Sequence, residues 1–136
     1  MIKKEVLFII IAVFLITLQG CCYDDKEVDV LLSNETPEQI YVHMRLSEIT
    51  NGDDEGTKAL ITRPWIFKKI PPYNTYKWEK IGANDGIWMV IIRQKTIDSY
   101  DSVYLASHCL YDSTMFFTTN QLQEINNIIE YKGGHQ

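Results

Sequence analysis

The run Ile87-Trp88-Met89-Val90-Ile91-Ile92 decides the fold, because it is the most apolar stretch of the chain after residue 20. Its six residues are too few for an ordinary helix, and four of them are β-branched. The sequence Ala83-Asn-Asp-Gly86, a strong turn signal, directly precedes it. A strand exposed on one face would alternate between apolar and polar residues, and this run does not. We therefore predict a central strand that is buried on both faces.

Shorter strands are predicted on both sides of this run. Residues 40–46 and 76–81 alternate between apolar and polar side chains, as half-buried strands do. Further strands are predicted at residues 28–32, 59–66, 103–110, 114–117 and 128–131. The turn residues at 33–37 predict that strands 28–32 and 40–46 form a hairpin. Thr118 and Thr119 are expected to cap a short helix over residues 120–126.

Seven or eight short strands, with turn signals about every ten residues, predict a mainly β fold. The expected architecture is an antiparallel β-sandwich, of which the immunoglobulin-like arrangement is one form, with one short helix near the C-terminus. The regular βαβ alternation of a doubly wound fold is missing from the pattern. We assign the β-sandwich domain to residues 28–132 and a loose tail to residues 133–136.

The first twenty residues have the organisation of a secretory signal peptide. Lys3 and Lys4 supply a short basic region, and thirteen largely apolar residues follow at 6–18. Thirteen helical residues span about 20 Å, whereas a transmembrane helix must cross about 30 Å of hydrocarbon. A secretory apolar region has this shorter length. Residues 1–20 are therefore predicted to be removed, and the alternative is that they stay as an uncleaved anchor.

The segment ends in Leu18-Gln19-Gly20-Cys21, which resembles the lipobox of bacterial lipoproteins. Gln19 departs from the small or β-branched residue that is usual there. The resemblance implies cleavage after Gly20, with Leu18 and Gly20 flanking the cleaved bond, and it makes Cys21 the lipid attachment site. It also implies a diacylglyceryl thioether on Cys21 and an acyl chain such as palmitate on the new N-terminus. Two or more chains hold a protein firmly to a bilayer.

Residues 21–27 form the predicted lipidated tether, Cys21-Cys-Tyr-Asp-Asp-Lys-Glu27. Its acidic stretch is similar to the surface-export signal of Bacteroidota-type lipoproteins, and an ordinary solvated linker is the alternative. We therefore expect attachment to the outer membrane through the lipid on Cys21, either displayed at the cell surface or on the periplasmic face. The membrane is the predicted partner.

The charge of the chain argues against nucleic acid as a partner. The whole chain carries −5, and removing residues 1–20, whose net charge is +1, leaves −6. Nucleic-acid binding depends on clustered Lys and Arg that face phosphates, and no basic run follows residue 4.

Several short motifs match one known group of proteins. They are Asn34 with Ile40-Tyr-Val-His43, Trp78, Trp88, Phe116-Phe117, and Thr119 with Leu122, Asn126 and residues 128–131. Their order resembles small uncharacterised Bacteroidota-type lipoproteins, in which a lipobox signal peptide precedes a single β-rich domain. His43 departs from the group, which has an aromatic residue there. The resemblance implies a β-rich exported domain and carries over no catalytic residue.

The motifs of metal and cofactor sites are incomplete in this sequence, so we predict no metal and no cofactor. Residues 51–56 resemble the start of a calcium loop, but Thr62 stands where the loop needs Glu. The three histidines are far apart and lack the spacing of zinc ligands. Cys22 and Cys109 can either pair in a disulfide or stay as a free Cys22 and a buried Cys109. Cys109 is not expected to be a nucleophile, because no third catalytic group is identifiable.

The aromatic residues give the only candidate binding surface. Trp65, next to Pro64, and Tyr73, next to Pro72, are expected at exposed positions where aromatic rings stack on sugars or anchor a protein. Core packing is the alternative for the aromatic residues of the region. The leading hypothesis is a non-enzymatic binding or accessory module at the cell envelope, for a protein or glycan ligand. The alternatives are a small envelope hydrolase acting on glycans or cell wall, and a structural or assembly component of the outer membrane.

Overall fold

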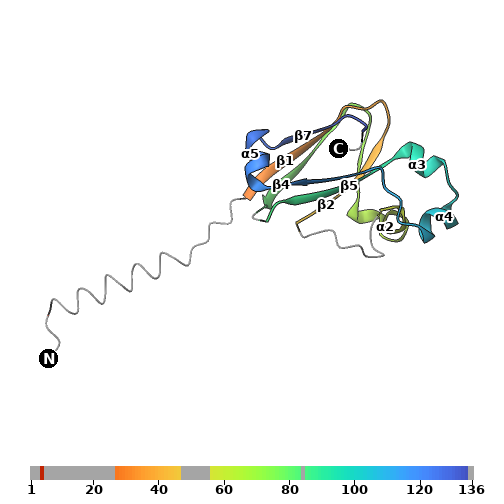
Figure 1. Ribbon diagram of the computed structural model, residues 1–136, viewed down its shortest axis with the longest axis horizontal. Coiled ribbons are helices and arrows are strands. Elements are labelled where there is room, and N and C mark those ends of the chain that lie inside the picture. Colours follow the sequence, from red (N-terminus) through yellow and green to blue (C-terminus); the bar gives the residue numbers. More distant parts are fainter. Residues whose placement is uncertain (1–3, 5–26, 47–55, 84, 135–136) are drawn as a thin grey trace.

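The apolar run forms the centre of a sheet, as Figure 1 shows. The structure is a computed structural model that describes residue 4 and residues 27–46, 56–83 and 85–134. One sheet has the order β3 (Lys68–Ile70), β2 (Ile40–Arg45), β5 (Ile87–Arg93), β6 (Ser113–Phe117), all antiparallel. The other has the order β4 (Thr75–Gly82), β1 (Glu27–Asn34), β7 (Ile128–Tyr131). Helices α2 (Gly56–Thr62), α3 (Gln94–Asp98), α4 (Ser102–Ser107) and α5 (Thr119–Glu124) and the 3₁₀ helix η1 (Pro64–Ile66) complete the fold.

The two sheets face each other across the main core. Buried side chains of β1 and β7 meet buried side chains of β2, β5 and β6 in one cluster, and Leu122 of α5 closes it. Its fully buried members include Val30, Leu32, Ile40, Val42, Ile87, Met89 and Ile91. Burying an aliphatic side chain contributes about 1.5–3 kcal/mol, so this cluster is the main source of stability. The predicted β-sandwich is confirmed.

The second face of β5 is covered by helix α2. Ala59 and Leu60 of the helix pack with Phe67 and with Ile92 of β5 in a separate buried cluster. Ile91 and Ile92, which point to opposite faces of the strand, are both 0% exposed. The prediction that this strand is buried on both faces is therefore confirmed.

Two of the predicted strands are helical, and the prediction of a single helix is wrong. Residues 59–66 form the end of α2 and the 3₁₀ helix η1, where Pro64 takes the first helical position that its fixed φ suits. Residues 103–110 include most of α4, which begins after Asp101. The Asp101 carboxylate accepts a 2.8 Å hydrogen bond from the backbone N–H of Tyr104, as an N-cap does.

The predicted hairpin between the first two strands is also wrong, because β1 and β2 belong to different sheets. Buried Asn34 organises the link between them. Its amide nitrogen donates to the carbonyl oxygens of Glu38 at 2.8 Å and Pro71 at 3.0 Å, and its amide oxygen accepts from the Thr36 hydroxyl at 2.7 Å. The first two strands of an immunoglobulin constant domain are neighbours in one sheet, so the strand order here is a different one.

The last two elements match the sequence pattern closely. Thr118 caps α5 with a capping box, in which Thr118 and Gln121 each accept a hydrogen bond from the other's backbone N–H. β7 then pairs with β1, but in parallel, with Leu31 opposite Ile128 and Asn34 opposite Tyr131. One pairing of the sandwich is therefore parallel rather than antiparallel.

The strands give the sandwich two ends. Strand β1, which begins at Glu27, starts at the end of the sandwich where α5 lies (Figure 1), and β6, which ends at Phe117, leads into α5. Helix α3, which directly follows the last residue of β5, Arg93, lies at the opposite end (Figure 1). We call these the Glu27 end and the Arg93 end.

Candidate functional site

A polar groove of about 390 Å³ opens at the Arg93 end. Residues from the end of β5, from α3 and its C-terminal turn, and from the segment before β6 line it: Arg93, Lys95, Thr96, Ser99, Tyr100, Leu110, Tyr111 and Asp112. Two cations, one carboxylate, hydroxyl groups and two tyrosines therefore share one hollow. Aromatic side chains together with polar groups that can fix the orientation of a ligand occur in small-molecule binding sites, and this groove has a larger polar share than most.

Asp112 fixes the floor of the groove. One carboxylate oxygen accepts a 2.7 Å hydrogen bond from the backbone N–H of Arg93. The hydroxyl of Thr96 reaches both carboxylate oxygens, at 2.7 and 2.9 Å, and the N–H of Asp112 donates to the carbonyl of Ile91 at 2.9 Å. Asp112 thus joins the start of α3 to the segment before β6, and its carboxylate has a structural role.

An ion pair links Arg93, the residue directly before α3, to Glu38, which lies between β1 and β2. Nη2 of Arg93 donates to Oε2 of Glu38 at 2.6 Å. The Arg93 guanidinium and its hydrogen bond hold the pKa of the Glu38 carboxyl below its usual value. The same hydrogen bond raises the pKa of Arg93. Glu38 is therefore a fixed anion at neutral pH.

Hydrogen bonds between uncharged side chains also hold the start of α3 in place. The Gln94 side-chain oxygen accepts hydrogen bonds from the Gln39 amide and the Tyr41 hydroxyl, both at 2.9 Å. The Gln94 backbone N–H donates to the carbonyl of Gln39 at 3.0 Å. Side chains that are locked in this way give a site a fixed shape before a ligand arrives.

Aromatic rings extend from the groove along α4. The Tyr100 and Tyr104 rings stack with centroids 4.8 Å apart, and the Tyr104 and His108 rings stack with centroids 3.9 Å apart. We call these three residues the aromatic ladder. Tyr100 belongs to both the ladder and the groove, and Tyr111 on the groove is 52% exposed.

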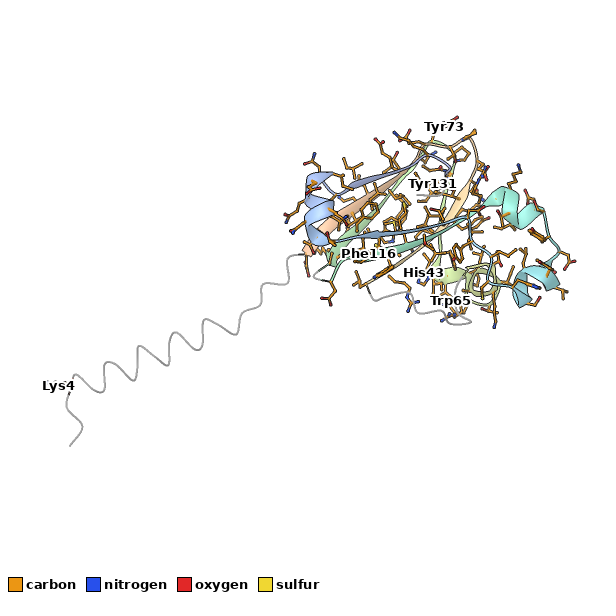
Figure 2. The ribbon with its side chains drawn as sticks, viewed as in Figure 1. Lys4, His43, Trp65, Tyr73, Phe116 and Tyr131 are labelled. Atoms are coloured by element: carbon orange, nitrogen blue, oxygen red, sulfur yellow. The ribbon has the colours of Figure 1, made fainter. Side chains whose placement is uncertain are left out.

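The two aromatic residues predicted from the sequence lie apart from each other and outside this groove. Trp65 on η1 is 72% exposed and Tyr73 is 69% exposed. Figure 2 places them on opposite sides of the molecule, so they do not form one surface. Tyr76 and Trp78 follow the alternative of core packing. Their ring centroids are 4.7 Å apart, and both side chains pack against the main core.

Several predicted site residues lie outside the described part of the chain. These are the lipid attachment residue Cys21, its flank Leu18 and Gly20, Cys22, and residues 51–55 of the calcium-like loop. Cys109 is described and is exposed, so the expectation that it is buried is wrong. It follows the short helix α4 rather than lying within a strand, and therefore no sheet covers it.

Two absences concern the described residues alone. Across residues 27–46, 56–83 and 85–134 no three His, Cys, Asp or Glu side chains are grouped to hold a metal ion. In the same part of the chain no helix has both the length and the apolar character needed to cross a membrane.

The aromatic ladder was not predicted from the sequence, because residues 103–110 were expected to form a strand. The spacing of Tyr100, Tyr104 and His108 is i, i+4, i+8, which places side chains on one face of a helix. This period was the available signal for the ladder. The polar residues of the groove carry no comparable signal, since Arg93 and Asp112 are 19 positions apart in the sequence.

Comparison with protein-family models, with curated proteins and with solved structures finds no match for this chain.

Proposed function

We propose that this chain is a lipid-anchored exported protein at the outer membrane, and that its β-sandwich domain binds a glycan ligand without chemically changing it. The N-terminal sequence supports the anchor, through the signal-like residues 1–20 and the lipobox that ends in Cys21. The polar groove supports the binding.

The position of the groove is the observation that carries the proposal. The groove lies at the Arg93 end, and β1 begins at the Glu27 end, six residues after Cys21. A lipid on Cys21 would hold the Glu27 end at the membrane and turn the groove outward. In that orientation the groove faces away from the membrane, so a ligand can reach it.

The chemistry of the groove favours a carbohydrate. Tyr100 and Tyr111 are 45% and 52% exposed at its wall, and aromatic faces stack on sugar rings. Lys95 and Ser99 supply hydrogen-bonding groups beside them. This combination of flat apolar faces and polar groups suits a ring that carries hydroxyls.

A hydrolase finds less support among the described residues. A general acid needs a carboxyl group whose pKa is raised towards neutrality, whereas the pKa values of Glu38 and Asp29 are both lowered. The carboxylate of Asp112 already accepts hydrogen bonds from the Arg93 backbone N–H and the Thr96 hydroxyl.

The experiment is calorimetric titration of the full membrane-extracted chain with a panel of envelope and host oligosaccharides. Tyr100→Ala and Tyr111→Ala should each weaken the binding of any active sugar about fivefold, since stacking contributes on the order of 1 kcal/mol per ring. Tyr73→Ala is the matched control, because Tyr73 is also an exposed tyrosine but lies outside the groove. Equal affinity in all three variants would reject the groove, and a reducing end released during titration would indicate a hydrolase.

A further inference from the structure

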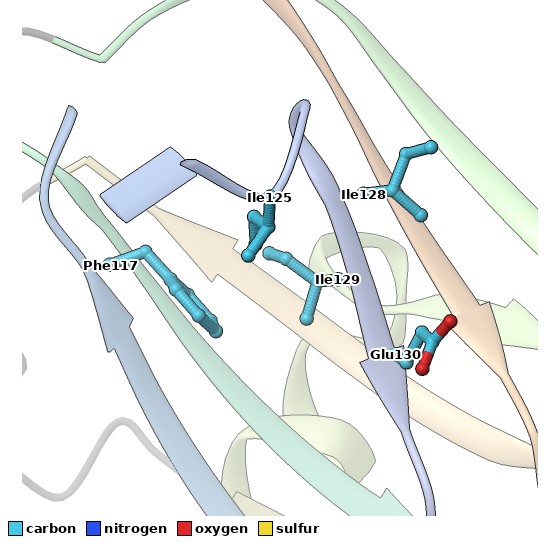
Figure 3. A pocket seen from close by; sticks show the side chains of 5 residues that line it. All are labelled: Phe117, Ile125, Ile128, Ile129 and Glu130. Carbon is cyan, nitrogen blue, oxygen red and sulfur yellow. The ribbon is translucent and has the colours of Figure 1, made fainter. Parts of the chain in front are cut away.

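The Glu27 end carries an apolar groove of about 490 Å³ between β6 and β7. Figure 3 shows Phe117 of β6, Ile125 after α5 and Ile129 of β7 converging on it, with Ile128 and Glu130 on the other side of β7. Ile129 is buried and forms the floor, whereas Ile125 is 36% exposed and Ile128 is 46% exposed. Two isoleucines at this end are therefore open to contact from outside.

The start of β1 lies close to this groove. Ile128 is paired with Leu31, only four residues beyond Glu27. Six residue steps separate Glu27 from Cys21, and an extended chain covers about 3.3–3.6 Å per residue. A lipid on Cys21 would thus keep the Glu27 end within about 20 Å of the bilayer, whatever path the tether takes.

The charges around the groove allow contact with a neutral lipid surface. Among the described residues that line the groove, Glu130 is the only ionisable one, and its carboxylate is 3.2 Å from the ammonium group of Lys132. The whole chain is acidic, so attraction to anionic headgroups is not the driving force. Apolar side chains such as isoleucine bury into the boundary between headgroups and acyl chains instead.

We propose that Ile125 and Ile128 contact the membrane surface beside the anchored Cys21 and thereby orient the domain with the Arg93 end outward. This proposal rests on the lipid anchor proposed above. The lipid attaches the domain to the membrane, and the two isoleucines set the orientation of the domain relative to the membrane. A weak apolar contact is sufficient for this role, because the tether has already brought the surface within reach.

The test measures the depth of two labelled positions in the lipidated full chain. Cys22→Ser and Cys109→Ser remove the two other thiols, and the thioether would block Cys21. Ile128→Cys and, as the matched control, Tyr73→Cys each receive the same small fluorophore; both native side chains are exposed. Tyr73 lies two residues before Thr75, which pairs with Ser33 near the end of β1 that is opposite Glu27. The proteins are placed on phosphatidylcholine vesicles whose acyl chains carry a nitroxide quencher.

We expect the chain to float with the vesicles, with strong loss of fluorescence at position 128 and little loss at position 73. Flotation with equal, weak quenching at both positions would overturn the membrane contact and leave the anchor standing. A dimer linked by a disulfide at position 128, formed when the unlabelled Ile128→Cys chain is oxidised in air, would assign the groove to a second copy and would also overturn the contact. Failure to float would overturn the anchor and this inference together. Circular dichroism that matches the parent chain shows that each variant is folded.

Discussion

Arg93 at the end of β5 donates a 2.6 Å hydrogen bond through Nη2 to Oε2 of Glu38, in the link between β1 and β2. The pair therefore ties the crossover between the two sheets to the start of α3, where the polar groove opens. Both side chains are partly buried, at 32% and 22% exposed. Charged hydrogen bonds in such positions contribute more to stability than those at the open surface.

Glu38→Gln should destabilise the domain at pH 7 by about 1 kcal/mol, because it removes the charge that Arg93 faces. The folded pKa of Glu38 is lowered, so its stabilising effect is complete above the unfolded pKa and is lost as the pH falls through the folded pKa. Urea unfolding at pH 7 and pH 3 measures both effects, and the difference in unfolding free energy between parent and variant should be smaller at the lower pH. Glu130→Gln, which breaks an exposed pair with Lys132, is the control and should have a smaller effect. Equal losses in the two variants would contradict the assignment.

His43→Phe should make the domain less sensitive to acid. His43 lies on β2, and the centroid of its ring is 5.3 Å from that of Phe67. Its buried Nδ1 has no hydrogen-bond partner among the described residues. Burial first, and the positive charges of Arg45 and Arg63 second, lower the pKa of His43 to about 4.

The sign follows from the two states. The unfolded chain gains a proton on His43 below about pH 6.5, whereas the folded chain resists it until about pH 4. His43 therefore has no effect above pH 6.5 and reduces stability as the pH falls from 6.5 to 4. Because His43 is only half-buried, we expect this loss to be about 1–2 kcal/mol. Free energies of unfolding at pH 7 and pH 4 measure it. If His43→Phe loses as much stability on acidification as the parent chain, the account of His43 is wrong.

Asn34→Ala should cost about 2–4 kcal/mol, since it leaves several buried backbone groups without their partners. Asn34 is 0% exposed, and its side chain forms hydrogen bonds with Thr36, Glu38 and Pro71. Asn74→Ala is the matched control, because Asn74 is exposed and its amide nitrogen donates a local hydrogen bond of 2.8 Å to the carbonyl of Pro72. Thermal unfolding of both variants gives the comparison. A control that is as unstable as Asn34→Ala would show that Asn34 does not organise the crossover.

Gly56→Ala should also destabilise the domain. Gly56 opens α2 at φ +69°, a left-handed conformation that favours glycine, and an added Cβ would lie 2.5 Å from the carbonyl oxygen of Leu110. Gly82→Ala places its Cβ in open space at an ordinary φ. The melting temperature should fall for Gly56→Ala and stay near the parent value for Gly82→Ala. An unchanged melting temperature for Gly56→Ala would contradict the close approach of α2 to residue 110.

The strands were predictable where one physical signal was sufficient. Residues 87–92 have no polar side chain, and burial on both faces follows from that fact alone. The same fact also implied a further layer, because a two-sheet sandwich buries only one face of each sheet. Helix α2 supplies that layer, which the predicted architecture lacked.

The helices α2 and α4 were missed because each is short and each contains β-branched or aromatic residues that also suit strands. Tertiary contacts decided between the two: Ala59 and Leu60 pack on Ile92, and Asp101 caps α4. The polar groove depends on pairs such as Arg93 with Glu38, which only the crossover between the sheets brings together. Such long-range pairs leave no local pattern in the sequence.

The central claim is that the chain works from a lipid on Cys21, and the mass of its N-terminal peptide tests this most directly. The chain is extracted from membranes with detergent and digested, and the N-terminal peptide is analysed by mass spectrometry. We predict a peptide that begins at Cys21 and carries the mass of a diacylglyceryl group, with an added acyl chain on its amino group. A peptide that begins at Met1, with an unmodified Cys21, would contradict the account.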